Sequence, residues 1–491
     1  MSHVDGRRHF VWGVVGALCV ATRVHAQGAP PAAHEDTAFD VMNVLSDHGL
    51  HDLDHENWNL YGQTTYISSW HPSFAAPYTN ANGSVNSLLP APEWSFTDSF
   101  TVFLAVRLWP GAEAYFVPEV ISERAFSGLH GIGGAIQNFE LQKTGSVTPQ
   151  VYMSRAYIRQ NIDLGGKLIE HTSQPTQLGR KVKSRRLVLT LGNFSVLDFF
   201  DRSSVAWDPR QTFFNMAFMT YASWDFNADA RGYTWGGIAE LDWDEWSMRI
   251  ARTASPQNPN VLPIDFRIWE YYGDQVELQH DHVLFGQPGA VRLLGYRNNV
   301  NAGRFADAIN TFAHDPTKNA AGCAAAGLYN YGSGNVTAPD LCWVRKENDK
   351  IGLGINIEQH VTKDLGVFAR WMTSDGQTEV DAYNPADRSF AFGATMKGGL
   401  WRRPFDVAGT GVALSWISSI HAQYLAMGGV DGFVGDGHLR QAGEGVTDVF
   451  YSYNLLKAIW LTADYQFLWH PGYNAARGPV NIVGGRVHAE F

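Results

Sequence analysis

In the C-terminal segment 480–491, uncharged and ionisable residues occupy alternate positions. The uncharged set is Val483, Gly485, Val487, Ala489 and Phe491, and the ionisable set is Arg486, His488 and Glu490. Because successive side chains of a β-strand point to opposite faces, this strand would have one apolar and one ionisable face. A soluble edge strand is one alternative, but a barrel strand with one face in lipid and the other in a wet lumen fits the pattern better. The segment therefore predicts the closing strand of an outer-membrane β-barrel.

The N-terminal segment has the layout of a secretory signal peptide. Arg7 and Arg8 precede an apolar run at 11–22, and Val24 and Ala26 occupy the −3 and −1 positions of a cleavage site. The run is shorter than the roughly 20 residues that a membrane-spanning helix needs. We therefore predict a signal peptide at 1–26, an N-terminal periplasmic segment at 27–57 and an outer-membrane barrel domain at 58–491.

Alternating segments of strand length recur after Trp58. In 101–109 the apolar residues at even positions oppose Arg107, and a Pro-Gly turn follows at 110–111. In 151–159, Arg155, Tyr157 and Arg159 have one parity, and Tyr152, Ala156 and Ile158 are expected on the opposite face. Similar alternation occurs at 186–191, 246–250 and 461–469. We predict an all-β transmembrane barrel of about 16 antiparallel strands, within a range of roughly 14 to 18.

Two long irregular segments are expected to fold into or across the lumen. The first, 122–145, is rich in glycine, and the second, 198–232, contains Trp207-Asp-Pro-Arg210. Both exceed ordinary loop lengths, which favours a functional role. A barrel this wide is expected to leave an aqueous channel.

Cys323 and Cys342 are the two cysteines that follow the predicted signal peptide, and they flank a loop-like stretch. In an oxidising periplasm, such a pair is expected to close as a disulfide that pins this loop. Two free buried thiols are the alternative. No further Cys or His lies close enough in sequence to favour a metal site.

Composition excludes several classes of protein. The net charge of −11 argues against nucleic acid as a partner. After the signal peptide, no apolar run is long enough for an inner-membrane helix. The 17 Trp, 19 Tyr and 28 Phe suit the aromatic girdles of a barrel. Phosphate-loop, dinucleotide and nucleophile-elbow motifs are absent from the sequence, so we expect neither a cofactor nor an enzyme.

Motifs of one known family recur in order along nearly the whole mature chain. They are Trp58-Asn-Leu-Tyr-Gly-Gln-Thr-Thr-Tyr66, His71-Pro72, Arg107-Leu-Trp-Pro-Gly-Ala-Glu-Ala-Tyr115, Pro118-Glu119, Gly192-Asn-Phe-Ser-Val-Leu-Asp198, Asp208-Pro-Arg210, Asp229-Ala-Arg-Gly-Tyr-Thr-Trp235, Gly435-Asp-Gly437 and Arg486-Val-His-Ala-Glu-Phe491. In these motifs the chain resembles the carbohydrate-selective porins of the OprB type. The resemblance implies passive diffusion of small sugars across the outer membrane. At Ala135, Ile136 and Phe139 this chain is more apolar than members of the family usually are.

A sugar-selective pore needs planar donors, carboxylate acceptors and aromatic walls, which Arg, Glu and Tyr or Trp supply. Residues of these types with the expected lumen parity are Arg107, Glu113, Tyr115, Glu119, Arg155, Arg159 and Arg249. We predict that a subset of them lines a constriction. The alternative for each is a structural charge ladder that stiffens the wall.

Small neutral sugars and outer-membrane lipid are the expected partners, and a homotrimer and a monomer suit the sequence equally well. A general diffusion porin without sugar selectivity is the main alternative. A barrel hydrolase lacks a nucleophile with histidine in register, and an energy-coupled importer lacks room for a plug domain. The segment 48–56, with His51 and His55 four residues apart, could hold zinc if helical, but a solvated linker fits it better.

Overall fold

The computed structural model describes residues 40–491. The predicted signal peptide at 1–26 and the first part of the predicted periplasmic segment lie outside the described residues. The strands are β1 Trp58–His71, β2 Glu93–Trp109, β3 Ala112–Arg124, β4 Gln150–His171, β5 Arg180–Phe194, β6 Thr234–Trp243, β7 Trp246–Pro256, β8 Ile264–Asp265, β9 Tyr272–Leu284, β10 Gln287–Ala302, β11 Lys346–His360, β12 Leu365–Ser374, β13 Arg388–Gly398, β14 Arg403–Trp416, β15 Glu444–Leu456, β16 Ile459–Trp469 and β17 Val480–Glu490. The helices are α1 Val41–Asp47, α2 Phe305–His314, α3 Ala320–Ala325 and α4 Ser419–Ala426, with short 3₁₀ turns between them.

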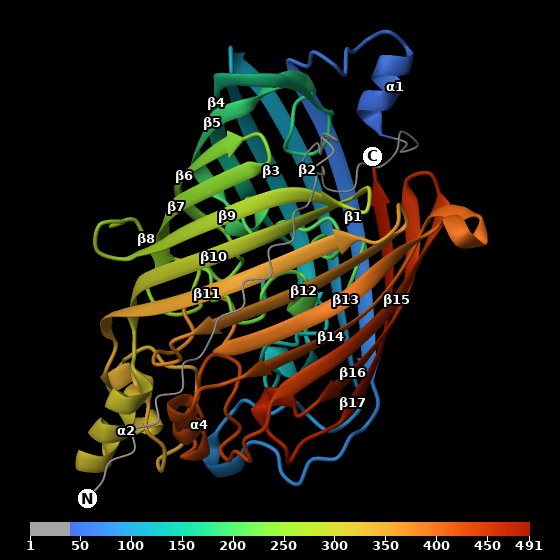
Figure 1. Ribbon diagram of the computed structural model, residues 1–491. Coiled ribbons are helices and arrows are strands. Elements are labelled where there is room, and N and C mark those ends of the chain that lie inside the picture. Colours follow the sequence, from blue (N-terminus) through green and yellow to red (C-terminus); the bar gives the residue numbers. More distant parts are fainter. Residues whose placement is uncertain (1–39) are drawn as a thin grey trace, which may run out of the picture.

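The strands close into one antiparallel barrel (Figure 1). The described sheet has 17 strands, of which β8 is a two-residue piece that pairs only with β7, so 16 strands form the wall. Closure comes from the pairing of β17 with β1, in which Val483 lies opposite Trp70. Both the predicted fold class and the predicted strand number are confirmed. No helix in 40–491 is long and apolar enough to cross a membrane.

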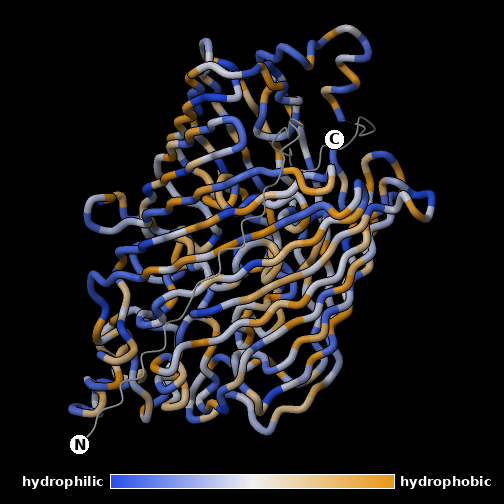
Figure 2. The backbone as a smooth tube through the Cα atoms, in the orientation of Figure 1, coloured by the Kyte–Doolittle hydropathy of each residue, from blue (hydrophilic) through white to orange (hydrophobic). Residues whose placement is uncertain are grey.

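The alternation of side chains along each strand explains why the sequence adopts this wall. In β17, Val483 and Val487 are 48% and 46% exposed, whereas Arg486 and His488 are buried on the inner face. The same alternation of apolar and polar residues runs along the other strands (Figure 2). Exposed tryptophans gather at both strand ends, as in the aromatic girdles of membrane barrels; they are Trp58, Trp109, Trp243 and Trp246 at one end and Trp70, Trp94, Trp235 and Trp416 at the other.

The two ends of the barrel differ in the length of their connections. At the end where α1 and the C-terminus lie, at the top of Figure 1, residues 110–111, 244–245, 285–286 and 457–458 form tight turns. At the opposite end, long connections carry α2, α3 and α4. Because outer-membrane barrels have short periplasmic turns and longer extracellular loops, we call these the periplasmic and the extracellular end.

Two extracellular connections fold back into the lumen. Loop A (125–149) joins β3 to β4, and loop B (195–233) joins β5 to β6. Gly131 in loop A has φ 81°, and a Cβ at this position would lie 1.9 Å from the backbone nitrogen of Leu88, so only glycine fits. The predicted lumen-folded loops are confirmed. The two loops fill part of the lumen, because apolar residues of both pack in one buried cluster with the wall.

The periplasmic mouth is partly covered by the N-terminal segment and the connection between β4 and β5. Asp40 caps α1 by accepting a hydrogen bond from the backbone N–H of Asn43 at 2.7 Å. Glu56 is buried and accepts hydrogen bonds from the Ser173 hydroxyl and the Gly179 N–H, both at 2.6 Å. The carboxylate of Glu56 therefore ties the N-terminal segment to the tip of the β4–β5 connection.

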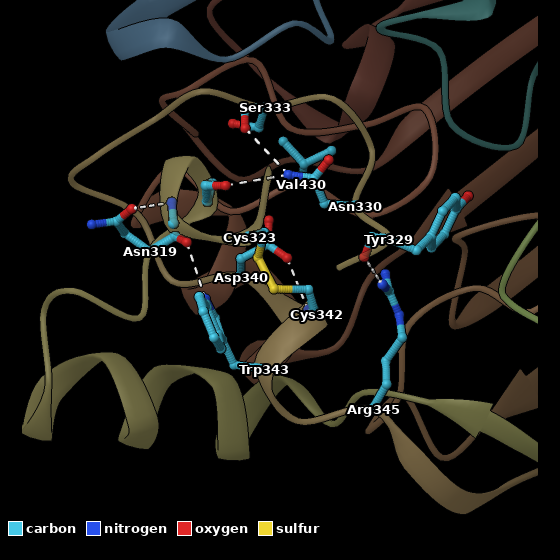
Figure 3. The surroundings of a disulfide bond; sticks show 12 residues. Asn319, Cys323, Tyr329, Asn330, Ser333, Asp340, Cys342, Trp343, Arg345 and Val430 are labelled. Atoms are coloured by element: carbon cyan, nitrogen blue, oxygen red, sulfur yellow. Dashed lines mark hydrogen bonds between the residues drawn. A yellow bond between two sulfur atoms is a disulfide. The ribbon is translucent and has the colours of Figure 1, made fainter. Parts of the chain in front are cut away.

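A disulfide between Cys323 and Cys342 joins α3 to the short turn that precedes β11 (Figure 3). The Trp343 indole donates to the backbone oxygen of Asn319 at 3.0 Å, and Arg345 donates to the backbone oxygen of Tyr329. These contacts gather the long extracellular connection between β10 and β11 into a compact unit.

Candidate functional site

Loop B crosses the lumen and is fixed to the opposite wall by buried ion pairs. Arg370 on β12 lies 3.0 Å from Asp201 and donates to the backbone oxygens of Phe218 and Ala206 at 2.7 Å. Lys350 on β11 lies 2.9 Å from Asp225. All these groups are buried, and removing one partner of a buried pair is strongly destabilising. The position of loop B in the lumen is therefore closely defined.

A cavity of about 780 Å³ remains on the other side of loop B. Its walls come mainly from β1 to β4, from loops A and B, and from the N-terminal segment and the β4–β5 connection at the periplasmic mouth. The lining is completed by Ala382, Tyr383, Glu490 and Phe491. Three of the predicted site residues, Glu119, Arg155 and Arg159, are part of its lining. This size suits small molecules, because ligand sites usually measure about 300–1,000 Å³.

Glu119 on β3 is the point where the two loops meet the wall. Its carboxylate lies 3.5 Å from the ammonium of Lys143 in loop A and 3.6 Å from the guanidinium of Arg210 in loop B. The hydroxyls of Tyr152 and Thr101 donate to the same carboxylate. Arg210 also binds Glu140 at 2.8 Å. A charged network of this kind places acceptors and donors side by side on the cavity wall.

Lys143 stays protonated in this environment. Burial lowers the pKa of its ammonium, but Tyr233 and Glu119 outweigh burial and raise the pKa above its ordinary value. The Lys143 ammonium donates to the Tyr233 hydroxyl at 3.0 Å and lies 4.7 Å from the centre of that ring. The cation is therefore held by contacts on two sides.

Arg155 and Arg159 on β4 hold their guanidinium groups in different ways. Arg155 forms a two-pronged pair with Asp198 of loop B, at 2.7 and 2.6 Å. Arg159 lies 5.0 Å from the ring centre of Tyr115 and 5.6 Å from that of Tyr157. It also donates to the backbone oxygen of Thr176, at the tip of the β4–β5 connection, at 3.2 Å. Only Arg155 of these two is paired with a carboxylate.

The other predicted residues are not among those that line the cavity. Glu113 accepts a hydrogen bond from Tyr115 at 2.5 Å and lies 3.0 Å from Arg180, and both Glu113 and Tyr115 are buried. Arg107 faces Glu113 across the β2–β3 hairpin. Arg249 on β7 is buried between Glu240 and Glu277, at 2.7 and 2.8 Å. Glu113, Tyr115 and Arg249 therefore belong to polar contacts within the inner wall, whereas Arg107 is placed only by its register opposite Glu113.

The prediction of which face of β4 carries Tyr152 is wrong. The alternation of 151–159 placed it opposite Arg155, yet its hydroxyl reaches Glu119 on the inner side. The cause is a shift in register between β3 and β4, where Val117 pairs with Arg155 and Pro118 pairs with Met153. The extra residue, Ser154, reverses the parity of the strand on one side of it.

Several cavity residues lie on loops, where parity gives no guidance. The long loops themselves were the available signal, because Trp207, Asp208 and Arg210 belong to the stretch expected in the lumen. The loop residues that line the cavity and were missed individually are Lys143, Asp198, Arg202, Arg210, Arg231 and Tyr233.

The structure also places the residues that were considered for metal binding. In 48–56, His51 lies 3.0 Å from Glu56, and His55 lies 3.4 Å from Asp52. Among the described residues, the one group of three potential ligands within reach of one another is Cys323, Asp340 and Cys342. Both of its sulfurs are used in the disulfide.

Comparisons with known proteins identify relatives of this barrel. The sequence model of the carbohydrate-selective porin, OprB family, matches residues 86–491. A high-pH structure of Pseudomonas putida OprB is 14% identical, with a TM-score of 0.62, and covers 89% of this chain and 94% of its own. A low-pH structure of the same protein is 13% identical, with a TM-score of 0.48, and covers 93% and 99%. No curated protein matches the sequence.

Proposed function

Because the chain belongs to the OprB family of carbohydrate-selective porins, we propose that it gives small, glucose-like monosaccharides a passive path across the outer membrane. Porins are channels rather than enzymes. At low identity, the structural likeness to P. putida OprB supports the barrel fold alone. The sugar preference and the residues that create it are inferred from the cavity of this chain.

The observation that carries the proposal is the mixed lining of the cavity. Arg155 and Arg210 present planar donors, Glu119 and Asp198 are acceptors, and Phe103 and Tyr383 are aromatic residues of the lining. A sugar hydroxyl can both donate and accept, and the C–H face of a sugar ring packs on aromatic rings. Binding to such a wall is shared among several weak contacts, which suits a solute that must also leave.

The test is block of single-channel current in planar bilayers. Glucose is titrated against the refolded mature chain and compared with an uncharged polyether of similar size. We expect saturable block by glucose and little block by the polyether. The Arg155→Gln variant should raise the half-blocking glucose concentration about tenfold, since a charge-assisted hydrogen bond is worth about 1.5–3 kcal/mol.

Arg297→Gln is the matched control, because Arg297 is 46% exposed, pairs with Asp349 and does not line the cavity. Its glucose block should equal that of the unmodified chain. Channels that are indifferent to every sugar would make the protein a general diffusion pore and contradict the proposal.

A further inference from the structure

The positive charges that line the cavity fall into two groups. Lys143, Arg155 and Arg210 each lie within 3.6 Å of a carboxylate. The second group has no ion pair with any described residue and consists of Arg159, Arg202 and Arg231. We call this second group the free arginines.

The carboxylates nearby are already engaged elsewhere. Asp198 is held by Arg155 and by the backbone N–H of Ser195. Asp229 accepts hydrogen bonds from the backbone N–H groups of Arg231 and Tyr233, at 2.9 and 3.0 Å, instead of from the Arg231 guanidinium. Neither of these carboxylates therefore forms an ion pair with a free arginine.

Each free arginine is held against the face of an aromatic ring. Arg202 lies 5.1 Å from the ring centre of Trp207, and Arg231 lies 4.6 Å from that of Tyr152. Arg159 packs on Tyr115 and Tyr157 as described above. Arg159 and Arg231 also donate to the backbone oxygens of Thr176 and Lys143, at 3.2 and 3.0 Å. Contact with an aromatic face leaves the remaining N–H donors at the edge of each guanidinium, because those donors lie in the plane of the group.

The surroundings of Arg202 disfavour its positive charge. Burial lowers the pKa of its guanidinium, the positive charges of Arg249 and Arg159 add to this effect, and the carboxylates of Asp198 and Glu240 offset it only in part. Arg249 is neutralised by two glutamates, whereas no described carboxylate lies within ion-pair distance of Arg202. An anion that enters the cavity would relieve this unfavourable arrangement.

We infer that the cavity prefers carbohydrate acids, hydroxylated solutes with one carboxylate, over neutral sugars of the same size. The free arginines would bind the carboxylate through their paired N–H donors. The acceptors and aromatic faces already assigned to sugars would bind the hydroxyls and the C–H face. The inference rests on the proposed function and narrows its substrate class.

A singly charged acid fits better than a phosphorylated sugar. Glu119, Asp208 and Asp229 also line the cavity, and they would repel a second negative charge. Nearer the periplasmic mouth, Asp40, Asp54 and Glu170 line the cavity. The negative charges of these acids weaken the binding of an anion in the cavity, which keeps its residence short, as conduction requires.

The experiment compares current block by gluconate, glucose and glucose 6-phosphate at constant ionic strength, with the full mature chain. We expect gluconate to half-block at a concentration about tenfold below that of glucose, since its carboxylate can form charge-assisted hydrogen bonds with the free arginines and glucose has no such group. The reversal potential in a potassium chloride gradient should show preference for chloride.

The variants Arg202→Gln and Arg231→Gln should each raise the half-blocking gluconate concentration about tenfold and change glucose block much less. Arg297→Gln should change neither. Heat-modifiable mobility on gels shows whether each variant forms the barrel, and a second variant replaces any that does not.

Equal block by glucose and gluconate, a preference for potassium, or tighter block by glucose 6-phosphate than by gluconate would each overturn the inference and leave the proposed function standing. Absence of block by glucose and gluconate alike would contradict both.

Discussion

Glu119 shows how one side chain can set the charge of a channel wall. It is buried, yet it borders the cavity and approaches a cation from each lumen loop. Its hydrogen bonds with Tyr152 and Thr101 fix the carboxylate in place. Glu119 therefore helps to hold both loops in position and also contributes a negative charge to the cavity wall.

Glu119→Gln keeps the size of the side chain and removes its charge. We expect the reversal potential in a salt gradient to shift toward chloride, because Lys143 loses a counter-ion. The free energy of unfolding should fall by about 2 kcal/mol through the loss of charge-assisted hydrogen bonds. Glu245→Gln, at an exposed position in a tight periplasmic turn, is the control. An unchanged reversal potential would rule out this role.

His421 makes the stability of the extracellular loops depend on pH. Its ring is buried between Asp387 and Asp431, at 3.1 and 3.2 Å. Burial lowers its pKa, but the two carboxylates outweigh burial and raise it to about 9. Because the folded pKa exceeds the unfolded value of about 6.5, the stabilisation is complete below pH 6.5 and is lost as pH rises through 9.

We expect this loss to be on the order of 3 kcal/mol. Melting temperatures in detergent at pH 6 and pH 9.5 measure it, with cleavage of the extracellular loops by protease as a local readout. In His421→Gln the difference between the two pH values should shrink. A difference of the same size in the variant would assign the pH dependence to other groups.

At the scale of elements, strands and loops differ in how far the sequence predicts them. The strands are predictable because each must bury one face and expose the other, which leaves a period of two, as in β17 and in β7 around Arg249. Register is harder, because one inserted residue such as Ser154 reverses the facing. Loop B follows no period, since its path is fixed by contacts such as Arg370 with Asp201, between residues far apart in sequence.

The extracellular unit between β10 and β11 should depend on its disulfide without affecting permeation. Reduction, or the double substitution Cys323→Ser with Cys342→Ser, frees a loop closed over a separation of 19 residues. By loop entropy the bond is worth about 3 kcal/mol. We expect faster protease cleavage within 324–341 and unchanged single-channel conductance. A changed conductance would show that this unit also shapes the path.

For the whole molecule, the sequence predicts the closed barrel and its lumen loops, but not how unevenly the lumen is filled. Loop B packs against β11 to β15, where Phe213 contacts Phe368 and Phe450. The cavity is left beside β1 to β4. Parity predicts which residues face inward, but it cannot tell the filled side from the open one. This explains why Arg249 and Arg155, both inward-facing, have such different surroundings.

Releasing loop B should widen the path. Arg370→Leu removes the guanidinium that binds Asp201 and two backbone oxygens, and breaking a buried pair costs about 3–5 kcal/mol. We expect larger and noisier single-channel currents, together with weaker block by glucose. Arg297→Gln again serves as the control. A stable channel of normal conductance would show that the other anchors of loop B suffice.

Because the cavity lies off-centre, substitutions on the two sides of the barrel should have different effects. Inward-facing residues of β1 to β4 border the cavity. We expect substitutions there to change which solutes pass while the barrel still folds. Inward-facing residues of β11 to β15 hold loop B in place. We expect substitutions there to change the width of the channel for every solute. Solute selectivity can therefore evolve on one side of the barrel while the other side keeps the channel width constant.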